Sequence, residues 1–358
     1  MSSSTAATMD SSTRLFFIFF TILLSQQVAS ASTVRMLTDV DDVYEIGPLS
    51  VETFTITDDT VYGRSLFVAI PEKEDEYPVV QLQHGFNMGN TDYKNLMKHV
   101  ASWGFIVIAP QMYTFPFFGY PIFNVTTEME HARGILDWLK GGFIASIPNR
   151  YKKKYANHRP NWEKVALAGH SRGGMVAFGL ALNPATNKGA QKYSAIIVLD
   201  PVDAVQGAYP SILPSYETNG MDLGVPTLIV GTGLGPKVKF LGQACAPSDK
   251  GHEVFYNNVS PPSYHFVAPL QGHMDFAQDC GFLDFFATRC FPVCASGGTS
   301  SRKRMQQFAG GITVAFLKDA LLNNNRTLLA ALDKSQLQAP ILIAAPEFKL
   351  PGKKPQYV

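Results

Sequence analysis

The 358-residue sequence lacks the excess of one charge that is common in nucleic-acid-binding proteins. Lysine and arginine number 30, aspartate and glutamate number 29, and the formal net charge is +1. Only 16% of the residues are charged whereas 46% are hydrophobic, the opposite of an intrinsically disordered composition. No repeat of fixed period is visible, which argues against a solenoid or propeller. These absences indicate a globular protein and give no reason to expect nucleic acid as a partner.

The N-terminal apolar run is too short to span a bilayer, which needs about 20 apolar residues. It covers residues 15–24, follows Arg14 and precedes Ala29-Ser30-Ala31, a small-x-small sequence typical of signal-peptide cleavage sites. We therefore predict a signal peptide over residues 1–31, a mature chain without a membrane span, and a location in the secretory pathway (ER, vacuole or extracellular). A chloroplast transit peptide is one alternative, because this front is hydroxyl-rich and has Asp10 as its single acid. An uncleaved anchor is another.

Two further features fit an oxidising, lumenal compartment and predict a glycoprotein. Acceptor triplets for N-glycosylation begin at Asn124, Asn258 and Asn325. Cysteine is scarce, and the last third of the chain holds all four: Cys245, Cys280, Cys290 and Cys294. An even number allows two disulfides, with four buried thiols as the alternative, and the pairing cannot be read from the sequence. No CxxC or HExxH pattern accompanies them, so we expect no zinc site.

Short apolar segments alternate with helical patterns along most of the chain. Strands are predicted at residues 65–70, 79–83, 105–109, 165–168, 196–199, 227–230 and 264–268, and helices at 93–103, 127–139, 173–182 and 302–322. Thr127 and Glu130 have the form of a capping box at the start of the second helix. Continuous apolar strands between helices favour an α/β class with a mostly parallel central sheet and helices on both faces. We assign residues 40–340 to a single domain and residues 341–358 to an extended tail.

The strongest chemical signal is Gly169-His170-Ser171-Arg172-Gly173. It lies between a predicted strand and a predicted helix, which is the context required for a G-x-S-x-G nucleophile elbow. Such a tight turn lifts the serine hydroxyl above the sheet, and glycines two residues away leave it room. The helix that follows directs N–H groups at developing negative charge. Ser171 is therefore the predicted nucleophile of an acyl-transfer site.

The partners of such a serine follow it in the order acid, then histidine. Asp200 ends the strand at residues 196–199 and is the preferred acid, and His273, in the loop beyond the strand at 264–268, is the preferred base. Both positions lie where the carboxyl ends of parallel strands meet, the edge at which ligands bind. Three cysteines follow His273 closely, so we expect a disulfide near it. The alternatives are Asp203 and Asp222 for the acid, and His252 and His265 for the base.

Two backbone N–H groups should form the oxyanion hole of this site. Arg172 supplies one as the residue after the serine, and Phe86, after His84-Gly85, is the candidate for the other. Residues 112–123, rich in aromatic side chains, follow the strand at 105–109 and should overhang the same edge. They suit a flat macrocycle or a long isoprenoid, although a buried core loop is the alternative. The predicted substrate-binding residues are Tyr113, Phe115, Phe117 and Phe118.

Taken together, these motifs resemble the plant chlorophyllase family, which has the α/β-hydrolase fold. The similarity extends over about residues 45–325 and includes Gln83-His84-Gly85-Phe86, Gly169-His170-Ser171-Arg172-Gly173-Gly174, Leu199-Asp200-Pro201-Val202 and Gly272-His273-Met274-Asp275. The resemblance places the catalytic triad on Ser171, Asp200 and His273. It implies a carboxylic-ester hydrolase that cleaves the phytyl ester of chlorophyll, a small-molecule substrate, to chlorophyllide and phytol. A serine triad needs neither metal nor other cofactor.

Other functions stay open on the sequence alone. The chain could be an esterase for other apolar esters, such as platelet-activating-factor-like lipids, cutin-like polyesters or general acyl esters. It could also be a non-enzymatic receptor of the hydrolase fold or a lipid-binding carrier. Many members of the resembled family are plastid enzymes, whereas the N-terminus here favours secretion. The sequence makes no prediction of oligomeric state.

Overall fold

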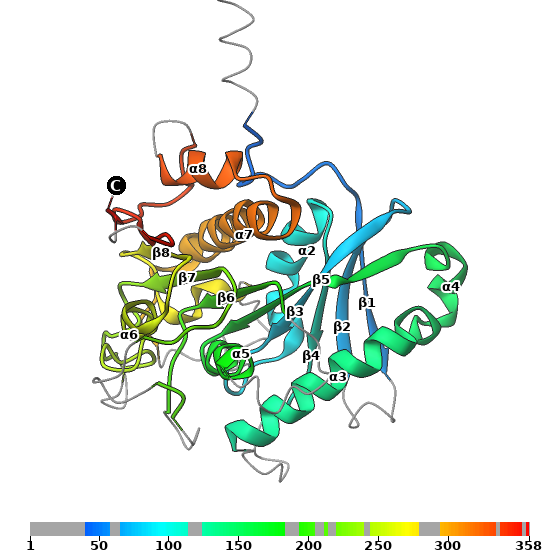
Figure 1. Cartoon of the computed structure of the whole chain (residues 1–358), viewed down its shortest axis with the longest axis horizontal. Helices are drawn as coiled ribbons and strands as arrows, with labels where there is room; N and C mark the ends of the chain where they lie inside the picture. Colours follow the sequence, from blue (N-terminus) through cyan, green and yellow to red (C-terminus); the bar gives the residue numbers. More distant parts are fainter. Residues whose placement is uncertain are drawn as a thin grey trace, which may run out of the picture. The chain divides into compact units, whose positions relative to one another are not determined.

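Ten strands among the described residues form one mixed sheet in the unit that spans residues 42–358 (Figure 1). The computed structural model describes residues 40–57, 65–113, 124–182, 193–204, 211–213, 220–239, 244–278, 294–333, 337–352 and 356–357. The strand order is β1-β2-β4-β3-β5-β6-β7-β8-β9-β10. The strands are β1 (Val51–Thr57), β2 (Ser65–Pro71), β3 (Glu76–Gln83), β4 (Ile106–Pro110), β5 (Arg159–His170), β6 (Ala195–Leu199), β7 (Thr227–Thr232), β8 (Ser263–Ala268), β9 (Glu347–Lys349) and β10 (Gln356–Tyr357).

The centre of the sheet is parallel, from β4 through β3, β5, β6 and β7 to β8. The outer strands are antiparallel to their neighbours, with β2 beside β4 and β1 beyond it, and with β9 beside β8 and β10 beyond it. The strands predicted from apolar runs are all present, as β2 to β8. Strands β4, β6 and β7 are buried along their whole length, which explains why they read as continuous apolar runs and not as alternating ones.

Helices cover both faces of this sheet. Figure 1 shows α2, α7 and α8 on one side and α3 and α5 on the other. Their bounds are α2 (Lys94–Ser102), α3 (Val125–Ser146), α4 (Asn149–Tyr155), α5 (Arg172–Leu182), α6 (His252–Asn258), α7 (Thr299–Leu322) and α8 (Arg326–Leu332), with short 3-10 turns η1 (Asn90–Tyr93) and η4 (His273–Phe276). The predicted α/β class, with the layout of an α/β-hydrolase fold, is thereby confirmed.

The start of α3 differs from the prediction. Asn124 is the N-cap, and its side chain accepts a hydrogen bond from the backbone N–H of Thr127 at 2.8 Å. The helix therefore begins before Thr127, and the capping box predicted for Thr127 and Glu130 is wrong. Asparagine is among the best N-cap residues, and its use here places Glu128 in the first turn of the helix, where it is buried.

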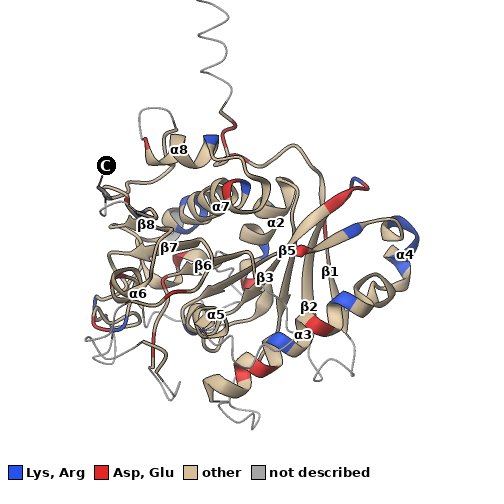
Figure 2. Ribbon diagram, in the orientation of Figure 1, with Lys and Arg blue, Asp and Glu red and all other residues tan. Residues whose placement is uncertain are grey.

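Charged residues of both signs occur along α3 and α7, and basic residues occur along α4 (Figure 2). Lys152, Lys153 and Lys154 are exposed on α4, and Lys303 and Arg304 are exposed on α7. These five basic side chains therefore lie on solvated helix surfaces. Among the described residues, none of the helices combines the length and the apolar character needed to cross a membrane.

The segment expected to be an extended tail contributes β9 and β10 to the sheet. β9 pairs with β8 from Ser263 opposite Lys349 to His265 opposite Glu347. The Lys349 ammonium group also donates to the carbonyl of Val259, directly after α6, at 3.1 Å. The tail is thus fastened both to the edge of the sheet and to α6.

Candidate active site

Ser171 occupies a tight turn between β5 and α5. Its φ is 55°, in the left-handed region that residues with a side chain seldom adopt. The glycines on either side make the turn possible, because a methyl group at Gly169 would lie 2.1 Å from the carbonyl oxygen of Gly173, and one at Gly173 would lie 2.3 Å from that of Gln83. The motif therefore folds as an elbow that presents the serine hydroxyl at the carboxyl ends of the parallel strands.

Three residues from distant parts of the chain form a hydrogen-bonded line at this elbow. His273 Nε2 lies 2.8 Å from Ser171 Oγ, and His273 Nδ1 lies 2.7 Å from Asp200 Oδ2. Asp200 directly follows β6, and His273 begins η4 after β8. These are the residues chosen from motif and chain order, and the structure brings them within hydrogen-bonding distance. The arrangement allows His273 to take a proton from the hydroxyl while Asp200 fixes its tautomer.

The Asp200 carboxylate is fully buried and is held at both oxygens. The backbone N–H of Thr232 donates to Oδ1 at 3.0 Å, and the Thr232 hydroxyl donates to Oδ2 at 2.8 Å. Burial alone raises the pKa of Asp200, but the hydrogen bond from His273, the neighbouring histidine charges and the Thr232 hydroxyl together lower that pKa below its ordinary value. The acid is therefore ionised and oriented before any substrate arrives. Its φ of 43° is also in the left-handed region.

The alternative acids and bases serve other parts of the fold. Asp203 accepts hydrogen bonds from the backbone N–H of Ile212 at 3.0 Å and from the Ser211 hydroxyl, and Asp222 lies in an exposed turn. His252 and His265 face each other, with 2.9 Å between Nδ1 of the first and Nε2 of the second.

His170, the residue before the serine, is buried and connects three parts of the site. Its Nε2 lies 2.8 Å from the carbonyl oxygen of His273 and its Nδ1 lies 2.7 Å from the Tyr93 hydroxyl, which also accepts the N–H of Gly85 at 3.0 Å. A carbonyl can only accept, so Nε2 carries the proton and Nδ1 accepts from Tyr93. Burial, and next the positive charge of His273, lower the pKa of His170 to about 3. The ring is therefore neutral.

The loop predicted to complete the oxyanion hole lies against the elbow. A methyl group at Gly85 would come within 3.2 Å of Ser171 Cβ, so this backbone passes directly beside the serine. The His84 ring holds the loop from the other side, with Nδ1 2.8 Å from the Gly85 carbonyl oxygen and Nε2 accepting the N–H of Met112 at 2.9 Å. Phe86 follows and is half-buried. The assignment of its N–H and that of Arg172 to an oxyanion remains a prediction.

The Arg172 side chain has a role that the sequence did not reveal. It is buried, and its Nε donates to the equally buried Glu128 carboxylate at 2.7 Å. Its guanidinium carbon also lies 5.6 Å from the centre of the Tyr113 ring. The start of α5, which carries the elbow, is thereby joined to the first turn of α3.

Tyr113 is the predicted substrate-binding residue that the described ranges include, whereas Phe115, Phe117 and Phe118 lie outside them. Its ring meets His84 edge to face, with 4.7 Å between ring centres, and its centre lies 6.1 Å from that of Phe86. Tyr113 is buried and packs against His84 and Phe86 in the loop after β3.

A disulfide joins Cys245 to Cys294. The segment after Cys294 contacts η4, because the backbone N–H of Gly297 donates to the Asp275 carboxylate at 3.0 Å. The cross-link thus supports the turn that carries His273, as expected. Cys280 and Cys290 lie outside the described residues.

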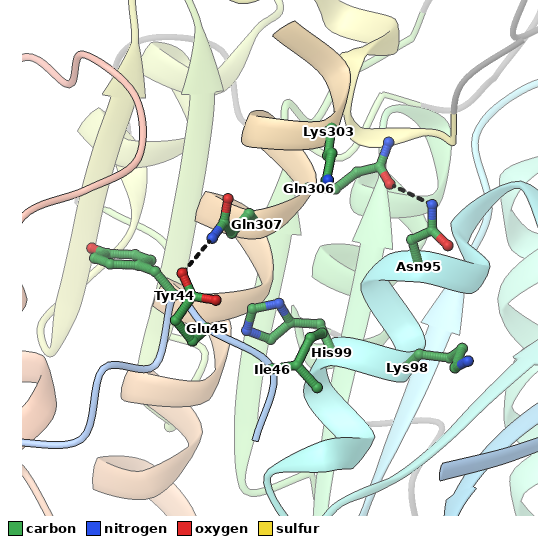
Figure 3. Close-up of a pocket in the computed structure, with 9 residues that line it drawn as sticks. All are labelled: Tyr44, Glu45, Ile46, Asn95, Lys98, His99, Lys303, Gln306 and Gln307. Carbon is green, nitrogen blue, oxygen red and sulfur yellow. Dashed lines mark hydrogen bonds between the residues drawn. The ribbon is translucent and has the colours of Figure 1, made fainter. Parts of the chain in front are cut away.

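A pocket of about 570 Å³ lies between residues 44–46, α2 and α7 (Figure 3). Figure 3 shows the hydrogen bonds from Asn95 to Gln306 and from Gln307 to Glu45 across its walls. None of the residues that line this pocket is Ser171, Asp200 or His273. Gln306 also donates to the carbonyl of Ala277, the residue after η4, at 2.6 Å.

The sequence motifs did not identify three residues that support the site: Tyr93, Glu128 and Thr232. Thr232 carried the clearest signal, because it ends β7 at the edge where functional residues gather. Glu128 could have been noticed as an acid in the first turn of a helix. Tyr93 ends η1 and gave no signal that would separate it from an ordinary core tyrosine.

Comparison with known proteins identifies close similarity to one family. Residues 39–349 match the family model described as Chlorophyllase. The chain is 36% identical to Chlorophyllase-2 of Arabidopsis thaliana over 285 residues, 78% of this chain and 85% of the relative. It is 34% identical to Chlorophyllase-1 of the same plant, covering 78% and 84% of the two chains. It is 35% identical to Chlorophyllase-1, chloroplastic, of Citrus unshiu, covering 72% of each.

The prediction that the chain enters the secretory pathway is wrong. The Citrus unshiu relative is named as chloroplastic, which points to the chloroplast instead. A short apolar run and a small-x-small sequence do not by themselves define a signal peptide, whereas the hydroxyl-rich, acid-poor front is a feature of transit peptides. Residues 1–31, the predicted signal peptide, lie outside the described residues.

Proposed function

Because the chain belongs to the chlorophyllase family, we propose that it is a serine carboxylic-ester hydrolase that cleaves the phytyl ester of chlorophyll to chlorophyllide and phytol. One observation carries the proposal: the line from Ser171 Oγ through His273 to Asp200, with distances of 2.8 and 2.7 Å. The family gives the substrate class, and the line gives the chemistry.

In the first half of the reaction, Ser171 Oγ attacks the carbonyl carbon of the propionate ester while His273 Nε2 takes the hydroxyl proton. The ionised Asp200 stabilises the imidazolium that forms. Negative charge develops on the former carbonyl oxygen, where the backbone N–H groups of Phe86 and Arg172 would donate to it. The tetrahedral species then collapses, the bond to the phytyl oxygen breaks, and His273 delivers its proton to that oxygen.

In the second half, water replaces phytol. His273 removes a proton from the water as its oxygen attacks the acyl carbon, and the same donors hold the second oxyanion. Collapse breaks the bond to Ser171 Oγ, which takes the proton back from His273. Chlorophyllide leaves as the free acid, which loses its proton to solvent, and the enzyme returns to its starting state. The neutral state of His170 matters at each step, because a positive ring beside His273 would oppose formation of the imidazolium.

The aromatic residues Phe115, Phe117 and Phe118 would supply the apolar surface for the pigment. Tyr113 is buried, so it would support that surface from beneath, through its contacts with His84 and Arg172. Aromatic rings bury large areas and stack on flat ligands.

The test is hydrolysis of purified chlorophyll a by the full-length protein, with chlorophyllide and phytol separated by chromatography. A short chromogenic ester, p-nitrophenyl butyrate, is assayed in parallel. The proposal expects turnover of both substrates. Hydrolysis of the short ester alone would mean a different esterase of the same family, and hydrolysis of neither would favour a binding protein.

Ser171→Ala is the matched control. It removes the nucleophile and leaves the elbow backbone in place, so we expect kcat to fall by roughly four to six orders of magnitude while the melting temperature is kept. Substantial residual turnover of chlorophyll by this variant would show that Ser171 is not the nucleophile.

A further inference from the structure

A second line of buried polar residues lies behind the proposed triad. His252 begins α6 and His265 lies in β8, with 2.9 Å between His252 Nδ1 and His265 Nε2. On its other side, His265 Nδ1 lies 2.7 Å from the Glu347 carboxylate on β9. Both rings are at least 95% buried, since their exposed fractions are 5% and 2%. The acyl-transfer chemistry leaves these residues without a role.

The line continues from His252 to the residue that holds Asp200. The His252 ring packs against the end of β7, beside Thr232. The ring lies flat against the backbone just before it, because a methyl group at Gly231 would come within 2.2 Å of His252 Cγ. Thr232 then gives its own N–H and hydroxyl to the two oxygens of Asp200.

The C-terminal strand fixes both ends of α6 around these rings. Glu347 binds His265, and two residues later Lys349 donates to the carbonyls of Tyr256 at 2.5 Å and Val259 at 3.1 Å at the end of α6. The Tyr256 ring stacks on His265 with 4.7 Å between ring centres. The position of His252 at the start of α6 is therefore set by β9 as well as by its own helix.

We propose that Glu347, His265 and His252 are positioning residues for the acid of the triad. Through the His252 ring, which packs on the Gly231 backbone, they hold the end of β7 so that the Thr232 N–H and hydroxyl keep both oxygens of Asp200 in the plane that His273 needs. The inference rests on the proposed function, because Asp200 acts as an acid only if the Ser171 line is catalytic. None of the three touches the ester.

The test uses full-length His252→Phe, which keeps an aromatic ring but removes the hydrogen bond to His265, so that Glu347 and His265 no longer hold the ring against Gly231. With p-nitrophenyl butyrate, kcat should fall about tenfold at constant KM, because a misplaced Asp200 slows the chemical step and leaves substrate binding unchanged. The acid limb of the kcat/KM profile should move to lower pH, since the His273 imidazolium is less well stabilised. His252→Gln, which keeps a polar group that can bind His265, should recover part of the loss, and Glu347→Gln should cause a smaller loss of about threefold with the same shift.

His99→Phe is the matched control, since His99 is also buried and donates to a backbone carbonyl, that of Val43, but lies outside this line. The His99→Phe variant should have the kcat of wild type and the same position of the acid limb. Two results would overturn the proposal. In the first, His252→Phe and Glu347→Gln change neither kcat nor the position of the acid limb. In the second, His99→Phe lowers kcat as much as the other two variants do, and the acid limb does not move in any of the three. If His252→Phe does not fold, Glu347→Gln and His252→Gln decide on the same criteria.

Failure of the proposed function would look different. In that case wild-type protein hydrolyses neither ester, and the Asp200 geometry is read instead from the far-downfield NMR signal of the His273 Nδ1 proton, assigned by its loss in Asp200→Asn. A shift of this signal in Glu347→Gln but not in His99→Phe supports the positioning role without any turnover. An unchanged signal overturns it.

Discussion

His170 donates a hydrogen bond from its Nε2 to the backbone carbonyl of His273 at 2.8 Å. The residue that precedes the proposed nucleophile thus holds the turn that carries the proposed base, across 103 positions of sequence. Through Tyr93, the same ring reaches the N–H of Gly85. One neutral imidazole therefore joins the elbow, the base and the loop assigned to the oxyanion.

The buried, neutral His170 ring should make the free energy of unfolding depend on pH. The folded pKa of His170, about 3, lies below the ordinary value of 6.5, so the unfolded chain binds a proton that the folded chain excludes. The contribution of His170 to stability is complete above pH 6.5 and is lost as pH falls towards 3, by up to about 1.4 kcal/mol per pH unit. His170→Gln lacks this term. We expect it to be less stable than wild type at pH 7 and the gap to narrow steadily between pH 6.5 and 5.

Urea unfolding of both proteins at half-unit pH intervals measures the gap directly. Parallel curves for wild type and His170→Gln over this range would show that the ring is not excluded from protonation in the folded state, and would contradict its assignment as a neutral donor to His273.

The buried pair of Arg172 and Glu128 predicts a non-additive effect on stability. Glu128→Gln removes one charge from a contact that is shielded from water, which typically costs about 3–5 kcal/mol. The double variant Arg172→Met, Glu128→Leu removes both charges and should be more stable than Glu128→Gln. Every variant keeps the backbone N–H of residue 172, so hydrolysis of a short ester should persist in those that fold. Chemical denaturation checks the order, and a double variant less stable than the single one would refute it.

The cross-link between Cys245 and Cys294 should contribute substantially to stability. It closes a loop with a sequence separation of 49, for which chain entropy predicts about 4 kcal/mol. Cys245→Ala with Cys294→Ala should lower the free energy of unfolding by about that amount and reduce kcat, because the segment after Cys294 supports η4. Thermal unfolding and short-ester turnover of this double variant decide it. An unchanged melting temperature would mean that the two thiols are not joined in the folded protein.

The aromatic segment predicts a change in substrate preference. Phe117→Ala and Phe118→Ala should lower kcat/KM for chlorophyll far more than for p-nitrophenyl butyrate, because only the pigment is large enough to need the apolar wall. The melting temperature should stay close to that of wild type. Equal losses on both substrates, or unfolding of the variants, would assign these side chains to the core instead of the pocket.

The parts of this site that could be predicted from sequence are those with fixed local spacing. Glycines around Ser171 mark the elbow, and the chain order of acid and histidine restricts the choice to Asp200 and His273 among few rivals. Apolar runs likewise located the buried strands, because a strand covered on both faces has no polar side to interrupt its pattern.

The supporting contacts could not be predicted, because they depend on the approach of distant segments. Nothing near Glu347 shows that a C-terminal strand returns to pair with β8 and reach His265. Glu128 looked like an ordinary helix-start acid until the fold placed Arg172 beside it. The secretory prediction failed for a different reason. A targeting signal is recognised by a receptor and does not pack in the fold, so the packing rules that identify strands and helices do not identify it.

The backbone of Asp200 restricts which acid can evolve at that position. At a φ of 43°, glycine, asparagine and aspartate are favoured over other residues, and of these aspartate alone is anionic. Glutamate would be strained in this backbone conformation, by roughly 1–2 kcal/mol. The turn itself, and not only the reach of the carboxylate, therefore selects aspartate, and Asp200→Asn is the substitution that silences the charge while sparing the main chain.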